Sequence, residues 1–377
     1  MPNQTDNLRV CILTSQYFGW GKIGGFGSMS RTLAESLAAR GIATSVIVPR
    51  RPGQQPHERL GNVNVLSFAP LDIREAARLL REIPADVFHS QDPQFLTALA
   101  RWLRPDAKHV VTCRDPREFR DWCVEFRDAT WSRRVRIPLN WFLEVGPLVR
   151  WGVRRADAVF TPAYFLREKA ARIFKPRVAV GFMPNLIEAP DPLPPKNEKP
   201  ALTFIGRLDR RKRPELFLDL ARQFPEMTFI VVGKAESKQR DQQLRKTYAS
   251  LPNVEWEGYI DRFKEPDRMR RILARTWALV NTASREGLPL TFQEAASYGC
   301  AIISEVDPDS FASRFGVHVA DGNFGVAVSS FLQSPDAVRR KGAEARRYVL
   351  ETYEATAATQ KHIDSYCHVV KQRDKRA

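Results

Sequence analysis

Strand-length apolar runs alternate with helix-length amphipathic runs along almost the whole of this 377-residue chain. The first apolar run, residues 9–14, precedes an amphipathic run that ends at Gly41, and a second apolar run begins at Ala43. Later runs such as NVNVLSF, ADVFHS and KHVVTC are interleaved with REAARLLREI and PQFLTALARWL. A strand that alternates with a helix predicts right-handed βαβ units and parallel sheets, so the expected fold class is α/β.

The alternation restarts after the proline-rich residues 184–200, which resist regular structure and predict a linker. We therefore expect a Rossmann-like domain over residues 1–190, a second one over 196–352, and a C-terminal helix with a basic tail over 353–377 that packs back on the first domain. A length of 377 residues suits two domains. Ligands of doubly wound sheets bind beyond the carboxyl ends of the strands, so two such domains are expected to face a cleft.

The charge and the cysteine content limit which partners and which cellular location are expected. The formal net charge of +16 attracts anions, which include nucleic acid, anionic lipid and phosphorylated small molecules. Five scattered cysteines without a CxxC spacing indicate neither a disulfide framework nor a zinc site. Neither a signal peptide nor an apolar run of roughly 18–20 residues is present, so a cytoplasmic protein is expected.

Two glutamates, Glu286 and Glu294, lie in the segment SREGLPLTFQEAASYGC. Pro289 suits the first turn of a helix that runs to Tyr298. The first-turn amides of such a helix have no intrahelical partner and favour a phosphate; they include those of Leu290 and Thr291. The glutamates flank this site, where their carboxylates can accept hydrogen bonds from the hydroxyls of a nucleotide sugar. Alternatively, Glu286 caps the helix and Glu294 is solvated.

A second motif, IGRLDRRKRPELF, places Arg207 and Lys212 on the loop after the first strand of the second domain. A guanidinium and an ammonium at this edge of a sheet can neutralise a diphosphate leaving group. Alternatively, this is a solvated basic loop that also contains Arg210, Arg211 and Arg213. Arg207, directly after a glycine at a strand end, fits that alternative least well.

Together the GR-x4-K motif and the E-x7-E motif resemble the retaining glycosyltransferases of family 4, which have the GT-B fold. Other matching pieces are IGGFGSMSRTLAESLAARG, ADVFHSQDP, VVT-x-x-D, ADAVFTP and the dipeptide at Pro184 and Asn185. The resemblance therefore covers nearly the whole chain. It implies a sugar transfer from a nucleoside diphosphate sugar to a hydroxyl acceptor, by a hexosyltransferase of glycan, polysaccharide or glycolipid assembly.

The resemblance also implies a role for each matching position. Arg207 and Lys212 would bind the donor diphosphate, Glu286 the donor sugar, and Glu294 the ribose hydroxyls. The sugar and phosphate pocket would be lined by Gly287, Leu288, Leu290 and Thr291, and the base would be flanked by Gly233, Lys234, Tyr259 and Ile260. In the first domain, backbone would approach the phosphates at Gly24, Gly25 and Gly27. Such enzymes are usually metal-independent, and no DxD-type cluster is present, so neither a metal nor a cofactor is expected.

One position departs from the family pattern, because Arg114 stands where members often carry a histidine that faces the reacting sugar. Arginine cannot act as a general base, but it can stabilise a departing phosphate or an anionic acceptor. In retaining transfer the leaving phosphate can itself take the acceptor's proton, so an active enzyme is predicted. Asp92 and Asp115 are candidates for contacting the acceptor, or have ordinary surface or capping roles. A non-catalytic scaffold of the same shape and a nucleotide-sugar epimerase are the alternatives.

Residues 114–155 mix arginines with four tryptophans and are expected to be a helical insertion. This composition suits an anionic membrane surface and a lipid-linked acceptor, or else core packing on one face with solvated arginines on the other. Nucleic acid is not expected as a partner, because no recognised module is present. The loop GGFGSMS resembles a dinucleotide fingerprint, but the second strand ends in VPRR and lacks the acidic residue that NAD binding needs. His89 is expected to be a hydrogen-bonded structural residue.

Overall fold

The computed structural model describes residues 7–17, 24–129 and 131–374 and consists of two compact units. The first unit contains Met1–Cys123, Trp131–Leu186 and Ala355–Ala377, and the second contains Val124–Thr130 and Ile187–Glu354. Ile23 of the glycine-rich loop and the basic tail at 375–377 lie outside the described residues. None of the helices in the described part is both long and apolar enough to cross a lipid bilayer.

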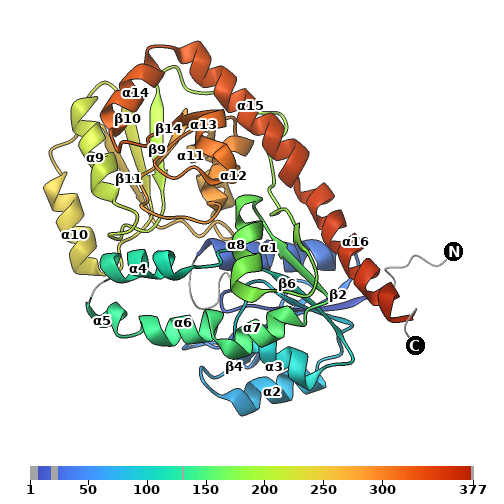
Figure 1. Cartoon of the computed structure of the whole chain (residues 1–377). Helices are drawn as coiled ribbons and strands as arrows, with labels where there is room; N and C mark the ends of the chain where they lie inside the picture. The colour runs from blue at the N-terminus through green and yellow to red at the C-terminus, as the bar shows by residue number, and fades with distance from the viewer. Residues whose placement is uncertain (1–6, 18–23, 130, 375–377) are drawn as a thin grey trace. The chain divides into compact units, whose positions relative to one another are not determined.

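The sheet of the first unit has the strand order β3-β4-β2-β1-β5-β6-β7-β8. Figure 1 labels its strands β2, β4 and β6. Neighbouring strands are parallel, except that β3 is antiparallel to β4. The polar sequence HERL of β3 gives no strand signal, which is why the apolar pattern does not predict it. The strands are β1 (Arg9–Leu13), β2 (Ala43–Pro49), β3 (His57–Leu60), β4 (Val63–Phe68), β5 (Val87–Ser90), β6 (Lys108–Thr112), β7 (Ala158–Thr161) and β8 (Val180–Phe182).

Helices connect these strands. The first of them begins at Gly25, so Gly25 and Gly27 lie in its first turn, and the prediction that they belong to a loop is wrong. Within its described residues, the expected helical insertion between β6 and β7 contains four helices, and residues 124–128 of the first of these belong to the second unit. The helices are α1 (Gly25–Ala39), α2 (Ile73–Glu82), α3 (Phe95–Leu103), α4 (Phe119–Asp128), α5 (Trp131–Arg134), α6 (Ile137–Val145), α7 (Pro147–Arg154), α8 (Phe165–Phe174) and α16 (Ala355–Asp374).

The sheet of the second unit is parallel throughout, in the order β11-β10-β9-β12-β13-β14. Its strands are β9 (Ala201–Ile205), β10 (Thr228–Val232), β11 (Val254–Gly258), β12 (Ala278–Asn281), β13 (Ala301–Ser304) and β14 (Gly316–His318). Its helices are α9 (Pro214–Gln223), α10 (Lys238–Thr247), α11 (Pro266–Arg275), α12 (Leu290–Ser297), the 3-10 turn η1 (Pro308–Ser310), α13 (Phe311–Phe315), α14 (Phe324–Leu332) and α15 (Pro335–Tyr353).

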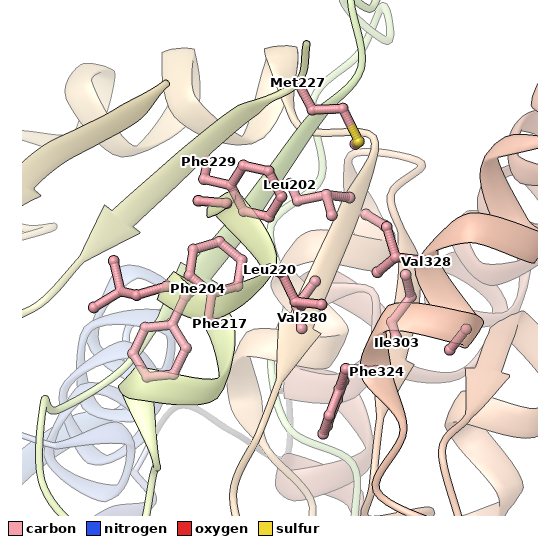
Figure 2. Close-up of a cluster of buried hydrophobic side chains, with 14 of the residues drawn as sticks. Leu202, Phe204, Phe217, Leu220, Met227, Phe229, Val280, Ile303, Phe324 and Val328 are labelled. Atoms are coloured by element: carbon pink, nitrogen blue, oxygen red, sulfur yellow. The ribbon is translucent and has the colours of Figure 1, made fainter. Parts of the chain in front are cut away.

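Apolar side chains between this second sheet and its helices form a core (Figure 2). Phe217 of α9 packs on Phe204 of β9 and on Phe229 of β10, with ring centroids 5.8 Å and 5.3 Å apart. Burial of such rings is the main stabilising contribution to a domain of this size. The core thereby anchors β9 and β10, and two of the predicted donor loops emerge from the carboxyl ends of these strands.

The strand order reverses once in the middle of each sheet. In the first unit β1 lies between β2 and β5, and in the second unit β9 lies between β10 and β12. Ligands of doubly wound sheets bind at this switch point, beyond the carboxyl ends of the strands. The predicted fold class, α/β with two parallel-sheet domains, is confirmed.

Candidate functional site

Lys212 and Glu286 form an ion pair at the switch point of the second sheet. Lys212 lies in the loop after β9 and Glu286 in the loop after β12, and their side chains are only 17% and 14% exposed. The Lys212 amide donates to the Asp209 carboxylate at 3.1 Å, and the Thr282 hydroxyl donates to the Lys212 carbonyl at 2.6 Å. The structure therefore brings the two sequence motifs together and holds Lys212 in place through both its amide and its carbonyl.

Of the two cations predicted to bind the diphosphate, Arg207 is more exposed than Lys212. Its guanidinium contacts the buried Asp209 carboxylate at 3.0 Å, and its side chain is 42% exposed. A half-exposed arginine beside a buried carboxylate is oriented, yet it can still reach a phosphate in solution. The solvated-loop alternative is wrong for two neighbours, since each pairs with a carboxylate of the same unit: Arg211 with Glu125 and Arg213 with Glu305.

The backbones of the loops after β9 and β10 approach each other closely. Gly233 has φ of +146°, and a Cβ there would lie 1.8 Å from the Gly206 carbonyl oxygen. The Leu208 amide donates to the Lys234 carbonyl at 3.1 Å, which ties the two loops together. Lys234 lies over the Tyr259 ring at 4.6 Å from its centroid. Only glycine at position 233 permits the close approach to Gly206. Three predicted donor-site positions, Gly233, Lys234 and Tyr259, are therefore in one connected group.

Glu294 pairs with Arg262, a residue that the sequence analysis did not identify. The side chain of Arg262 is 23% exposed and that of Glu294 is 18% exposed, so the alternative of a solvated Glu294 is wrong. Burial lowers the pKa of Arg262 to about 10, although Tyr259 and Asp261 oppose this shift. The only available signal was the position of Arg262 in the loop after β11, close to the tyrosine already singled out. Ile260 in the same loop is buried.

The helix α12 begins at Leu290, with Pro289 at its N-cap, so the expected start at Pro289 is one residue early. No side chain caps this end of the helix, and Glu286 pairs with Lys212 instead of capping it. The uncapped end leaves first-turn amides for an anion. The partly buried residues at this end are Gly287, Leu288, Leu290 and Thr291.

In the first unit Arg114 is buried at the end of β6, with 6% exposure. It donates to the Asn185 side chain at 2.7 Å and to the Gln91 side chain. Burial lowers the pKa of Arg114 to about 10, with Asp92 opposing the shift, so the group stays charged near neutral pH. Arg114 is thus a fixed positive charge and not a proton acceptor.

Carboxylates cluster near this arginine. Burial, reinforced by Glu144, raises the pKa of Asp92 to about 8. Arg117 contacts Asp115 and Glu144, each at 3.4 Å. Asp92 and Asp115 follow β5 and β6, so both lie at the carboxyl edge of the sheet, where the acceptor candidates are expected. Among the described residues, no group of three or more histidines, cysteines and carboxylates is arranged to hold a metal ion.

His89 is fully buried and hydrogen-bonded, as predicted. Its Nδ1 lies 2.6 Å from the Tyr366 hydroxyl and its Nε2 lies 2.8 Å from the Thr112 hydroxyl. Burial lowers the pKa of His89 far below its ordinary value, with further contributions from His362 and Arg114. This histidine therefore joins the sheet to α16 and stays neutral.

Gly24, at the start of α1, permits the close approach of the Gln16 side chain from the loop after β1. A Cβ on Gly24 would lie 2.8 Å from the Gln16 side chain, whereas Gly25 is exposed and Gly27 is buried. The N-cap of α1 makes no side-chain hydrogen bond. As for α12, an uncapped helix end next to small residues suits an anion.

Comparison with known proteins gives matches to both units. The family model described as Glycosyltransferase Family 4 matches residues 23–189, and that described as Glycosyl transferases group 1 matches residues 187–318. The lipopolysaccharide 1,6-galactosyltransferase of Salmonella typhimurium is 28% identical over 131 residues, which span 34% of this chain and 36% of that protein. The chain thus matches about a third of the length of this curated relative.

Solved structures share the fold at low sequence identity. Sucrose-phosphate synthase from Thermosynechococcus elongatus superposes with a TM-score of 0.72 at 15% identity, over 98% of this chain and 100% of that chain. Anabaena HepE in complex with UDP-glucose superposes with a TM-score of 0.66 at 12% identity, over 94% and 98%.

Proposed function

Because the chain belongs to glycosyltransferase family 4 and has the GT-B fold, we propose that it transfers a hexose from a nucleoside diphosphate sugar to a hydroxyl acceptor with retention at the anomeric carbon. The observation that carries the proposal is the meeting of Lys212 and Glu286 at the switch point of the second sheet. The Lys212 ammonium is suited to the leaving diphosphate, and the Glu286 carboxylate is suited to the sugar hydroxyls.

In the proposed reaction the bond from the anomeric carbon to the diphosphate oxygen breaks. Arg207 and Lys212 stabilise the charge that develops on this oxygen. The bond from the anomeric carbon to the acceptor oxygen forms on the same face, and the acceptor's proton passes to the departing phosphate. No side-chain base is needed, which agrees with a fixed positive charge at Arg114.

The remaining contacts orient the donor. We assign the ribose hydroxyls to Glu294 and the base to the loops at Gly233, Lys234, Tyr259 and Ile260. We assign diphosphate contacts to the amides at the start of α12 and to the glycines at the start of α1. Asp92 and Asp115 are proposed to contact the acceptor. The reaction is proposed to need no metal, because two cations and uncapped helix ends supply the positive charge.

A glycan or lipid-linked acceptor is proposed on the strength of the relatives. The galactosyltransferase from Salmonella typhimurium acts on lipopolysaccharide according to its name, and HepE was solved with UDP-glucose. These names support a role in glycan, polysaccharide or glycolipid assembly and a uridine donor as the first to test.

Donor binding tests the site directly. Thermal unfolding midpoints are measured with UDP, GDP, ADP and their sugars, since a ligand that binds only the folded state raises the midpoint. One nucleotide family should raise it, with EDTA present, and Arg207→Ala and Glu294→Ala should lose the shift. Lys246→Ala, at an exposed lysine of α10 in the same unit, is the matched control and should keep it. No shift with any nucleotide at millimolar concentration would contradict the proposal.

Turnover tests the chemistry. With the donor identified, transfer to a lipid-linked or sugar acceptor is followed by anomeric proton NMR, which reports the configuration of the new bond. Lys212→Ala should lower kcat by about 10²–10³, the usual effect of removing a group that stabilises a developing oxyanion. Inversion at the anomeric carbon would refute the proposed retention.

A further inference from the structure

The helices α5 to α7 of the first unit, whose ribbons Figure 1 labels, carry large apolar side chains that are exposed. Trp131 is 78% exposed, Val135 72% and Leu139 55%, while Trp141, Phe142 and Leu148 are between 40% and 52% exposed. In α6 only Val145 is buried. The core-packing alternative is therefore wrong for Trp131 and Trp141, although Trp122 of α4 is buried as that alternative expects.

The uncovered charges of the same helices are positive. Residues 131–155 contain six arginines, one glutamate and neither lysine nor aspartate, a surplus of five positive charges. Arg136, Arg150 and Arg154 are exposed, whereas the one carboxylate, Glu144, contacts Arg117 at 3.4 Å. The surface thus combines exposed apolar groups with unshielded positive charge.

The geometry points to one occupant for this surface, and we propose that it is an anionic lipid bilayer. Aromatic and aliphatic side chains enter the boundary between headgroups and acyl chains, while arginines stay at the level of the anionic headgroups. A second copy of the chain is disfavoured, because two such faces would bring like charges together. Nucleic acid would use the arginines but would leave Leu139, Phe142 and Leu148 in water.

The arrangement of the chain supports an interfacial role. Gly146 ends α6 and begins α7, and a Cβ there would lie 2.2 Å from the Phe142 carbonyl oxygen. The two helices therefore meet at a bend that only glycine allows, and α7 is held to the body of the unit by Val149 and Val153. A bend anchored in this way keeps α6 at the surface and does not let it fold back into the core.

This inference rests on the proposed function for one point only: a lipid-linked acceptor would then lie in the membrane that the surface binds. Binding itself needs no catalysis. Lys212→Ala should therefore bind vesicles like the wild type, so that vesicle binding without transfer would refute the proposed function and leave the inference intact.

The test is co-sedimentation of the purified chain with phosphatidylcholine vesicles that contain or lack phosphatidylglycerol. We expect binding to the anionic vesicles, weakened at high salt, with a blue shift of tryptophan fluorescence. The double variant Arg136→Gln/Arg150→Gln should bind about 25-fold more weakly, at about fivefold for each arginine. Trp141→Ser/Phe142→Ser should also bind more weakly, and should lose part of the blue shift.

Matched controls come from the other unit. Val326→Ser and Arg222→Gln change side chains of α14 and α9 that are 63% and 59% exposed, and both variants should bind as the wild type does. Far-UV circular dichroism checks that all variants are folded. Equal binding to neutral and anionic vesicles, or unchanged binding by both double variants, would overturn the proposal. A dimer in sedimentation velocity that Trp141→Ser/Phe142→Ser dissociates would overturn it too, because the face would then serve self-association.

Discussion

Replacing His109 in the first unit should change how the stability of the protein depends on pH. His109 is buried in β6, its Nε2 lies 2.8 Å from the Arg104 carbonyl, and its ring stacks on Phe88 with centroids 5.6 Å apart. Burial lowers the pKa of His109 to about 4, with a smaller opposing contribution from the Arg104 carbonyl. The ring is therefore neutral in the folded protein at pH 5 and protonated in the unfolded chain.

The sign follows from proton binding. Below pH 6.5, the ordinary value, the unfolded chain binds a proton that the folded protein does not, so the free energy of unfolding falls as the pH falls from 6.5 towards 4. At 1.36 kcal/mol per pH unit, this one group costs about 2 kcal/mol between pH 8 and pH 5. Above pH 6.5 it costs nothing.

His109→Phe removes the titration and keeps the ring. At pH 8 the variant should be less stable by about 1 kcal/mol, the usual net value of one lost hydrogen bond. At pH 5 it should be more stable than the wild type by a similar amount, so the two curves cross near pH 6. Urea unfolding followed by circular dichroism at pH 8, 6.5 and 5 gives both curves.

His57→Phe, at an exposed histidine of β3, controls for the substitution itself. Other buried histidines of the first unit, such as His362 with its pKa lowered to about 3 by burial, act in the same direction in both proteins and cancel in the difference. A difference between wild type and His109→Phe that stays constant from pH 8 to pH 5 would refute the reasoning.

Three further substitutions probe the contacts that hold the two units' sites. Gly233→Ala should destabilise the second unit by at least about 2 kcal/mol and abolish nucleotide binding, because the new Cβ meets the Gly206 carbonyl. Unchanged urea and nucleotide titrations would contradict this prediction. Arg262→Ala should raise the donor KM about tenfold at constant kcat, because Glu294 loses its partner, and Arg262→Lys should restore part of the effect in steady-state kinetics. Tyr366→Phe should lower the urea midpoint of the first unit, because it leaves a buried imidazole nitrogen of His89 without its hydroxyl partner at a cost of about 1–3 kcal/mol. Unchanged hydrogen exchange along β5 in this variant would show that the contact is unimportant.

The alternation of apolar and amphipathic runs was enough to predict both sheets, because a parallel strand buried on both faces is apolar along its whole length. The family resemblance implied that Lys212 and Glu286 both contact the donor, and the structure adds that their loops follow adjacent strands at the switch point. The position of a residue just after a strand is a local property of the sequence, so it can be predicted from a single chain.

Long-range partners could not be predicted in the same way. Arg262 is one of many arginines, and nothing in its neighbourhood indicates that it pairs with Glu294, because that pairing depends on how the loop after β11 lies against α12. The exposure of Trp131 and Trp141 could not be predicted either, since a tryptophan beside arginines is compatible with both a core and an interface.

The place of α16 bears on the order in which the protein is made. The chain leaves the first unit at Leu186 and returns to it at Ala355, after the whole of residues 187–354. A ribosome therefore delivers every strand of the first sheet early, yet delivers Tyr366 and His362 of α16 late. Until then His89 lacks the Tyr366 hydroxyl, although the Thr112 hydroxyl of the neighbouring strand is already present. The unit whose synthesis begins first is accordingly completed last, so its unfinished form is exposed during synthesis for longer than that of the second unit.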